Sequence, residues 1–205
     1  MRLRHRRHFS RVAVKLWHHR RARLASHPVR SDISMSDLGD RIMKVDHAGE
    51  HGAIAIYSAQ ILMARFTCPD TVAALIEFRS HECRHRSVFE AELRRRGVRR
   101  CRSYWLCGIG GYALGAITGL FGRSAIAATT VAVESVVLRH LEEQLGRLDS
   151  LDPTAAAAIH SIVEEERQHR DHAASDLDAK GFWPKLLTPV VSASTEAVIW
   201  LGMKM

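Results

Sequence analysis

The residues with the clearest chemical potential in this chain are two Glu-x-x-His pairs. Glu82 stands three residues before His85, and Glu166 stands three residues before His169. Residues three apart share one face of a helix, so each pair can present a carboxylate and an imidazole to the same point. This mixture of oxygen and nitrogen donors suits iron or manganese better than it suits metals that prefer thiolates. A single pair is usually ordinary helix surface, so the interpretation depends on what surrounds the two.

A further glutamate stands 32 residues before each pair. The glutamates at this spacing are Glu50 with Glu82 and Glu134 with Glu166. The midpoints of the two spacings fall beside Cys68-Pro69 and within Asp149–Pro153, where Pro and Asp predict turns. In an antiparallel helix hairpin, residues equidistant from the turn lie level with each other. The sequence therefore predicts two hairpins, each of which sets one glutamate opposite a Glu-x-x-His pair.

Glu134 is the only charged residue between Ser124 and Leu138. A lone carboxylate on an apolar helix is costly unless it is paired or bound to metal. Packing the two hairpins together would gather four carboxylates and two imidazoles, which is the arrangement of ferritin-like carboxylate proteins. Four carboxylates can balance two divalent cations and bridge between them.

Apolar periodicity and turn signals predict an all-α fold with six helices. Their expected ranges are about 36–66, 70–96, 104–121, 124–148, 153–180 and 184–200. Four of them would form a ferritin-like bundle, and the apolar third and sixth would associate with a membrane. This domain is expected to span residues 32–205, after a basic tail at 1–31.

The positive charge of the chain is concentrated in that tail. Residues 1–31 contain ten Lys or Arg and no acidic residue, which leaves 20 basic and 22 acidic residues in the remainder. The body is therefore not interpreted as a nucleic-acid binder. The tail resembles a mitochondrial presequence, could be a basic arm for an anionic membrane, or is an extension that does not fold with the body. The four cysteines form no C-x-x-C pair, which fits a reduced, intracellular setting.

Residues 103–122 form an uncharged segment of 20 residues, long enough for a membrane span. Gly111, Gly115 and Gly119 make a repeated small-x-x-x-small face that permits close approach of another helix. We therefore expect a helix that packs on the bundle and lies at or partly in a membrane surface; the alternative is a buried core helix. The last helix carries an apolar stripe, interpreted as core, at Leu186, Leu187, Val190, Val191, Val198 and Leu201. Its ends, Trp183, Trp200 and Lys204, leave an interfacial role open.

Glu50 has two glycine neighbours, Gly49 and Gly52, although an interior glycine costs a helix about 1 kcal/mol relative to alanine. We expect them to leave space for a small molecule or a neighbouring helix. Tyr57 follows two turns later on the same face, either oriented towards the metals or substrate or placed in the core. Outer-layer or surface positions are expected for His47, His51, His81, Glu164 and His172.

Several stretches of the sequence resemble demethoxyubiquinone hydroxylase, the di-iron monooxygenase family of late ubiquinone biosynthesis. They are V-D-H-A-G-E-H-G-A around Glu50, G-G-Y-A-L-G-A-I-T-G before the fourth helix, V-A-V-E at Glu134 and E-E-E-R-Q-H ending at His169. The resemblance covers about residues 41–205, and D-H-A-G-E is its most specific part.

The resemblance implies a ferritin-like bundle with two iron ions per chain. By motif, the ligands are Glu50, Glu82, His85, Glu134, Glu166 and His169. It also implies that O2 and an external reductant, NADH or the quinol itself, serve to hydroxylate the ring of a polyprenyl demethoxyubiquinone or demethoxyubiquinol. His140 matches a family histidine linked to electron delivery, and Leu141 follows it where animal members have tyrosine.

The function predicted is thus a di-iron monooxygenase, with an iron-storage or peroxide-handling protein on the same scaffold as the alternative. The apolar helices disfavour storage, and the missing C-x-x-C disfavours a rubrerythrin-like peroxide enzyme. A membrane-surface module without metal is the remaining option. The expected location is peripheral, on the cytoplasmic face of the bacterial cell membrane, with the mitochondrial inner membrane as the alternative. A homo-oligomer or a complex of ubiquinone-biosynthesis proteins is a possible assembly.

Overall fold

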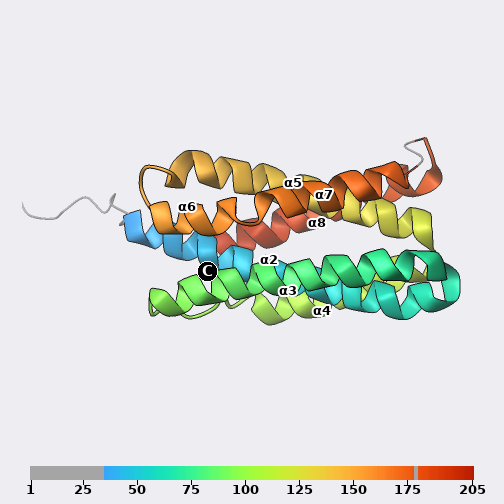
Figure 1. Ribbon diagram of the computed structural model, residues 1–205, viewed down its shortest axis with the longest axis horizontal. Coiled ribbons are helices and arrows are strands. Elements are labelled where there is room, and N and C mark those ends of the chain that lie inside the picture. The colour runs from blue at the N-terminus through green and yellow to red at the C-terminus, as the bar shows by residue number, and fades with distance from the viewer. Residues whose placement is uncertain (1–34, 178–179) are drawn as a thin grey trace, which may run out of the picture. The chain divides into compact units, whose positions relative to one another are not determined.

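Helices make up all the regular structure in the described part of the chain. The computed structural model describes residues 35–177 and 180–205 (Figure 1). Its elements are α2 (Met35–Thr67), the 3₁₀ turn η1 (Pro69–Thr71), α3 (Val72–Arg95), α4 (Tyr104–Leu120), α5 (Arg123–Leu148), α6 (Pro153–His160), α7 (Val163–Ser175) and α8 (Phe182–Lys204). The all-α prediction is confirmed. The predicted basic tail at 1–31 lies outside the described residues.

Two antiparallel hairpins form the bundle. The first joins α2 to α3 through Cys68 and η1, and the second joins α5 to α6 and α7. In Figure 1, α3 and α7 lie in front, whereas α4 and α8 lie behind. The contacts agree, since α4 packs on α2 and α8 packs on α5. The expected four-helix bundle with two added apolar helices is therefore confirmed.

The single helix expected at 153–180 is wrong in two respects. It breaks between α6 and α7, where the N–H of Ile162 donates to the carbonyl of Ile159 at 3.1 Å, a tight 3₁₀-type bond. Both isoleucines are buried in the core. Its end also comes earlier, at Ser175, because the chain again tightens into bonds of this type at Asp176 and Leu177. No glycine or proline marks the break.

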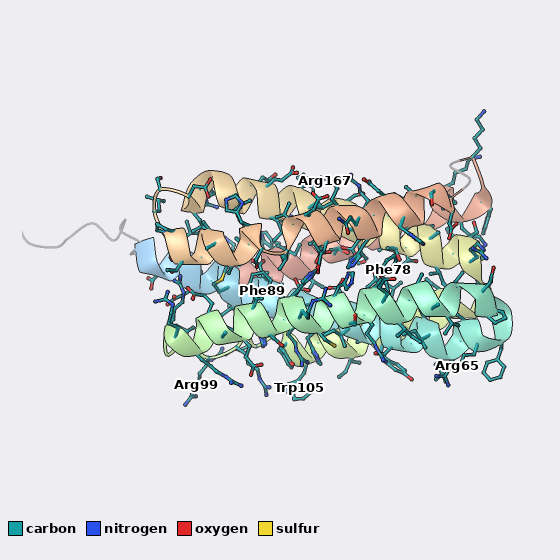
Figure 2. All side chains as sticks on the ribbon, viewed as in Figure 1. Arg65, Phe78, Phe89, Arg99, Trp105 and Arg167 are labelled. Carbon is teal, nitrogen blue, oxygen red and sulfur yellow. The ribbon has the colours of Figure 1, made fainter. Side chains whose placement is uncertain are left out.

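The bundle core consists of two apolar layers. One includes Ile42, Phe89 and Ile159, and the other includes Tyr57 and Phe78. Figure 2 shows the two phenylalanines, Phe78 and Phe89, between the helices at separate points along the bundle. On α3, the segment between these phenylalanines carries Glu82 and His85, so the polar residues occupy a level enclosed by apolar packing at both ends.

Glycines let α4 approach α2 closely. A Cβ added at Gly111 would lie 2.4 Å from the carbonyl oxygen of Gly52, and one at Gly115 would lie 2.2 Å from that of Ile56. The predicted small-residue face is thus confirmed as the contact surface. The opposite face of α4 is open to solvent, with Ile109 71% exposed, so the alternative of a wholly buried core helix is wrong.

The interpretation of the α8 stripe as core is wrong for three of its residues. Val191 is buried, but Leu186, Val190 and Leu201 are exposed. They lie away from α5 and α2, the helices on which α8 packs. In the described part of the chain, α5 and α8 are long and apolar enough to cross a membrane by length and composition alone. For α5 the apolar window is 67% buried, as in a core helix, whereas for α8 it is 11% buried.

An ion-pair network ties the end of α3 to α2 and α6. Arg96 donates to Glu92 at 2.7 Å, to Asp152 at 2.8 Å and to Asp40 at 3.2 Å. Hydrogen bonds from Arg95 and Arg96 outweigh burial and lower the pKa of Glu92 to about 2. The hydrogen bond from Arg96 chiefly lowers the pKa of Asp152 to about 2.

We expect Gly115→Ala to lower the free energy of unfolding by about 1–3 kcal/mol, because its methyl group would press against the α2 backbone. Gly110→Ala is the matched control, since a Cβ there meets nothing within 4 Å. Alanine at that position should leave stability equal or raise it by up to about 1 kcal/mol. Urea denaturation measures both variants. Equal effects would contradict the close contact between α2 and α4.

We expect Arg96→Met to lower the free energy of unfolding at neutral pH by about 2–4 kcal/mol, because Asp40, Glu92 and Asp152 each lose a charged hydrogen-bond donor. The folded pKa values of Glu92 and Asp152 are depressed from 4.5 and 3.8, so their stabilising effect is present above those values and is lost as the pH falls towards 2. The variant should therefore lose less stability than the wild type between pH 5 and pH 2.

Arg94→Met, which removes an exposed pair with Glu90, is the control for the network. It should change the unfolding free energy by less than about 1 kcal/mol. Parallel acid-dependent denaturation curves for Arg96→Met and wild type would contradict the role of the network.

Candidate metal centre

Six side chains from four helices meet in the middle of the bundle. α2 and α5 each contribute one glutamate, and α3 and α7 each contribute a Glu-x-x-His pair. The six residues are Glu50, Glu82, His85, Glu134, Glu166 and His169. None has more than 6% of its surface exposed. The structure thus brings together all six residues singled out in the sequence.

The cluster divides into two overlapping groups of four residues, and within each group the ligand atoms lie within 4.8 Å of one another. One group contains Glu50 and His85, and the other contains Glu134 and His169. Glu82 and Glu166 belong to both. Because a carboxylate has two oxygens, a shared glutamate can serve both groups at once. The arrangement could therefore hold two cations side by side, with Glu82 and Glu166 within reach of both.

Both histidines face the carboxylates through Nδ1. For His85, this atom lies 2.7 Å from Oε1 of Glu166 and 3.7 Å from Oε2 of Glu50. For His169, it lies 3.1 Å from Oε1 of Glu82 and 3.7 Å from Oε2 of Glu166. Each imidazole therefore contacts a carboxylate of the other hairpin, so the site is complete only when the two hairpins pack together.

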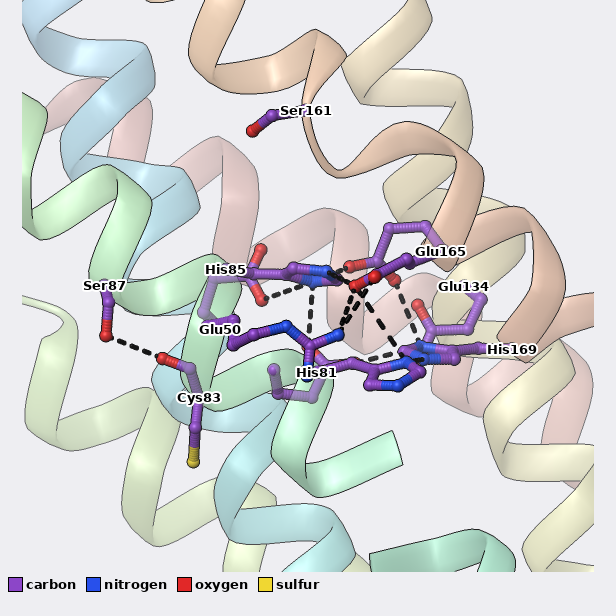
Figure 3. A network of polar contacts seen from close by, with 12 residues as sticks. Glu50, His81, Cys83, His85, Ser87, Glu134, Ser161, Glu165 and His169 are labelled. Atoms are coloured by element: carbon purple, nitrogen blue, oxygen red, sulfur yellow. Dashed lines mark hydrogen bonds and ion pairs between the residues drawn. The ribbon is translucent and has the colours of Figure 1, made fainter. Parts of the chain in front are cut away.

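An outer layer of polar side chains holds the opposite ring nitrogens (Figure 3). Nε2 of His85 lies 2.7 Å from Oε2 of Glu165, to which Arg84 donates at 3.0 Å. Nε2 of His169 lies 2.9 Å from Nδ1 of His81. Contacts of this kind fix the orientation of an imidazole and leave its other nitrogen for a cation.

Several atoms at the centre of the cluster have no hydrogen-bond partner, because their close contacts lack hydrogen-bond geometry. These atoms are Oε2 of Glu50, Oε1 of Glu82, Nδ1 of His85, both carboxylate oxygens of Glu166 and Nδ1 of His169. Each unsatisfied buried group costs about 1–3 kcal/mol. Two divalent cations would engage these atoms and balance four carboxylates, so the donor set fits a two-metal cofactor.

The electrostatics of the cluster agree with this fit. Burial, followed by the charges of Glu82 and Glu166, raises the pKa of Glu50 well above its ordinary value. Burial and the same two neighbours raise the pKa of Glu134. Burial lowers the pKa of His169, but the contacts with Glu166 and Glu82 outweigh it and raise this pKa to about 9. The cluster thus retains protons that bound cations would displace.

Tyr57 lies beside the cluster. Its buried hydroxyl donates to Oε1 of Glu134 at 3.0 Å, and its ring meets that of Phe78 edge-on. Tyr57 therefore belongs to the core and is also directed towards the candidate centre, where it holds Glu134. Its role in a reaction stays a prediction.

A cavity of about 280 Å³ reaches the cluster from the side of α4 and α8. Its lining includes all four glutamates of the cluster but neither histidine. Gly49 and Gly52 also line it. A Cβ at Gly49 would meet nothing within 4 Å, whereas one at Gly52 would lie 3.4 Å from Cys107 of α4. Gly49 therefore leaves room for a small molecule, and Gly52 leaves room for the neighbouring helix.

His140 lies on the cavity wall, outside the metal-ligand cluster. Its Nε2 lies 2.8 Å from Oε2 of Glu196 on α8. His47 and His51 lie on another side of α2, where both rings stack on Tyr104 of α4.

The other two residues expected outside the cluster also lie apart from it. Glu164 is exposed and pairs with Arg167 at 2.8 Å. His172 is exposed as well, with its ring edge-on to that of Phe78.

Three residues of the site were missed in the sequence. Glu165 directly precedes Glu166 in E-E-E-R-Q-H, and this position was the only feature of the sequence that could have placed it at the site. Asp46 and Gln144 line the cavity and hydrogen bond to each other at 3.0 Å. Asp46 stands one turn before Glu50, which places it on the same face of α2.

The known proteins to which this chain is similar are named as 3-hydroxylases of demethoxyubiquinol or demethoxyubiquinone. The 3-demethoxyubiquinol 3-hydroxylase of Rhodospirillum rubrum is 32% identical over 174 residues, which cover 83% of this chain and 80% of the relative. Proteins named NADPH-dependent 3-demethoxyubiquinone 3-hydroxylase, mitochondrial, from Dictyostelium discoideum and Mus musculus are 30% and 33% identical; each alignment covers 80% of this chain and 76% of the relative. The family model described as ubiquinone biosynthesis protein COQ7 matches residues 37–202. The resemblance found in the motifs is thus confirmed, and the chain belongs to the COQ7 family of ubiquinone biosynthesis proteins.

Proposed function

We propose that this protein is a di-iron monooxygenase that hydroxylates the ring of demethoxyubiquinone or demethoxyubiquinol with O2. The observation that carries the proposal is the pair of overlapping four-residue groups that share two glutamates. The proposed ligands are Glu50, Glu82, His85, Glu134, Glu166 and His169. Membership in the family and the names of the relatives support the reaction.

The chain's own residues would hold the cofactor and exclude water from it. Glu82 and Glu166, which belong to both groups, would help to hold both irons, and Glu165 and His81 would keep the two imidazoles in place. Bound iron would supply the activation of O2, which amino-acid side chains cannot perform alone. The two apolar layers of the bundle would shield this level from water at both ends, which strengthens the electrostatic interactions within it.

The cavity is the proposed place for the substrate ring. It meets the cluster on its carboxylate side, and most of its lining is apolar. Exposed residues of both neighbouring helices, Leu106 of α4 and Ser194 of α8, belong to the lining, so we place the entrance between these helices. A polyprenyl tail could then extend along the exposed apolar faces of α4 and α8.

The reaction needs two electrons from an external reductant. The relatives from Dictyostelium discoideum and Mus musculus are named NADPH-dependent, which favours a reduced nicotinamide nucleotide for this chain too. Iron storage, the alternative considered from the sequence, is not favoured. The relatives are named as hydroxylases, and the cavity beside the cluster is mostly apolar, whereas storage needs a polar route for iron.

The decisive variant is Glu134→Gln. It keeps the shape of the side chain but removes the charge of a ligand proposed for one of the two iron sites. We expect ring hydroxylation of a short-tailed demethoxyubiquinol to fall at least a hundredfold and bound iron to fall from two per chain towards one. Product analysis by mass spectrometry and metal analysis of the same sample measure the two effects.

Glu142→Gln is the matched control, because Glu142 is an exposed residue of the same helix that pairs with Arg167. It should keep both activity and iron content. In contrast, Glu82→Gln should lower the occupancy of both sites, because Glu82 belongs to both groups. Full turnover by Glu134→Gln, or wild-type protein that binds no iron, would overturn the proposed centre.

We further propose that α4 places the protein peripherally on a membrane, either a bacterial membrane or the mitochondrial inner membrane. Its outer face exposes Trp105, Leu106, Ile109 and Tyr112. The Arg100 guanidinium lies 4.8 Å from the Tyr104 ring centroid and 5.0 Å from that of Trp105. Figure 2 shows Trp105 and Arg99 extending outward from the same edge of the bundle. Apolar and aromatic side chains beside arginines are typical of contact with anionic lipid.

Ile109→Glu should lower the fraction of protein that sediments with vesicles of anionic phospholipid at least fivefold, because the new charge would have to enter the lipid. Ile76→Glu is the control: Ile76 is also an exposed isoleucine, but it lies on α3, away from this face. It should leave sedimentation unchanged. An equal loss in both variants, or none in either, would count against α4 as the membrane face.

A further inference from the structure

One polar pair on the cavity wall has hydrogen-bonding capacity that neither the fold nor the metal centre uses. Gln144 of α5 donates through Nε2 to Oδ1 of Asp46 on α2, at 3.0 Å. The second oxygen of Asp46, Oδ2, is buried and has no partner, and the same is true of Oε1 of Gln144. Both residues line the cavity. Gln144 is itself only 8% exposed.

The other polar side chains of the cavity outside the metal cluster are already engaged. The hydroxyls of Ser194 and Thr195 both donate to the carbonyl of Val191 at 2.9 Å. Nε2 of His140 lies against Glu196. Outside the metal cluster, Asp46 Oδ2 and Gln144 Oε1 are therefore the buried acceptors left open among the described side chains of this wall.

An open buried acceptor is costly, so a site that keeps two of them is expected to meet a ligand that donates. A hydroquinone ring carries two hydroxyl groups that can donate, whereas the corresponding quinone carries only carbonyl oxygens, which accept. Two acceptors facing a quinone carbonyl would be left unsatisfied. This difference gives the pair a means of discriminating between the two oxidation states of one ring.

From this geometry we infer that Asp46 and Gln144 bind a ring hydroxyl of the substrate and select its reduced, hydroquinone form. The inference rests on the proposed function and specifies its substrate. Asp46 stands one turn before Glu50, so a ring held at Asp46 lies beside the carboxylate side of the centre. Burial raises the pKa of Asp46 to about 7, although the hydrogen bond from Gln144 lowers it, so a donor from the ligand would stabilise the ionised carboxylate.

The test is anaerobic equilibrium dialysis of the iron-loaded protein at pH 8.5, above the pKa of Asp46, where its carboxylate is ionised and only accepts; no turnover occurs. The two ligands are demethoxyubiquinol with a two-isoprene tail and the corresponding quinone. Wild type should bind the quinol about tenfold more tightly than the quinone, which is the value of one good hydrogen bond. Asp46→Asn replaces the open acceptor with an amide N–H donor, so it should weaken quinol binding about tenfold and leave quinone binding equal or tighter, which removes or reverses the preference. Gln144→Met should weaken quinol binding about fivefold.

Gln60→Met is the matched control. Gln60 is also a buried glutamine with an unpartnered Oε1, but it hydrogen bonds to Thr118 and does not line the cavity. It should leave both affinities unchanged. Iron content and melting temperature identify any variant that fails to fold, in which case the remaining variant decides.

The outcomes separate this inference from the proposed function. If wild type binds neither ligand, the proposed function fails. If wild type binds both but the ratio of affinities is unchanged in Asp46→Asn and Gln144→Met, the function stands and the role of this pair is overturned. A preference of wild type for the quinone would overturn the selection of the reduced ring.

Discussion

The burial of four carboxylates at one level of the bundle is the constraint on which the rest of the structure depends. Negative charges this close cannot all remain ionised in an apolar interior without compensating positive charge. The chain supplies two imidazoles, and it leaves ligand atoms of the cluster without hydrogen-bond partners. The apolar layers above and below, with Phe89 on one side and Phe78 on the other, exclude the water that would otherwise solvate the charge. The fold that buries these carboxylates therefore also creates the need for cations to balance them.

The two sides of this level serve different purposes. On the α3 and α7 side, Glu165 and His81 fix the imidazoles, and neither imidazole lines the cavity. On the α2 and α5 side, the carboxylates face an open cavity that α4 and α8 cover. α4 lies close because Gly111 and Gly115 have no side chain to separate it from α2. The helices that hold the imidazoles are thus different from the helices that cover the cavity. α4 and α8 can therefore be apolar without changing the six candidate ligands.

The six candidate ligands could be predicted because their geometry follows from spacing along the chain. Equal separations of 32 residues about two turns are enough to place each glutamate opposite its Glu-x-x-His pair. Contacts across helices without such regularity gave no signal. Gln144 reaches Asp46 across 98 positions and His85 reaches Glu165 across 80, and neither contact follows from a repeat.

The break before α7 could not be seen in the sequence, because helical spacing continues through it at Ile159, Ile162, Glu166 and His169. The exposure of α8 was missed because the sequence of an apolar stripe is the same whether the stripe packs against protein or contacts lipid.

The stretch from Asp46 to Gly52 shows why so much depends on α2. In two turns it provides an open acceptor at the cavity wall, a ligand carboxylate, a gap at Gly49 and a close helix contact at Gly52. A methyl group in place of Gly49 would occupy free space beside Glu50, whereas one in place of Gly52 would already be in van der Waals contact with Cys107 of α4. The helix propensity that these glycines give up, about 1 kcal/mol each, is small beside the cost of one unsatisfied buried carboxylate. Because tertiary packing on three sides already holds α2 as a helix, the chain can place glycine where the site needs space rather than where helix formation favours it.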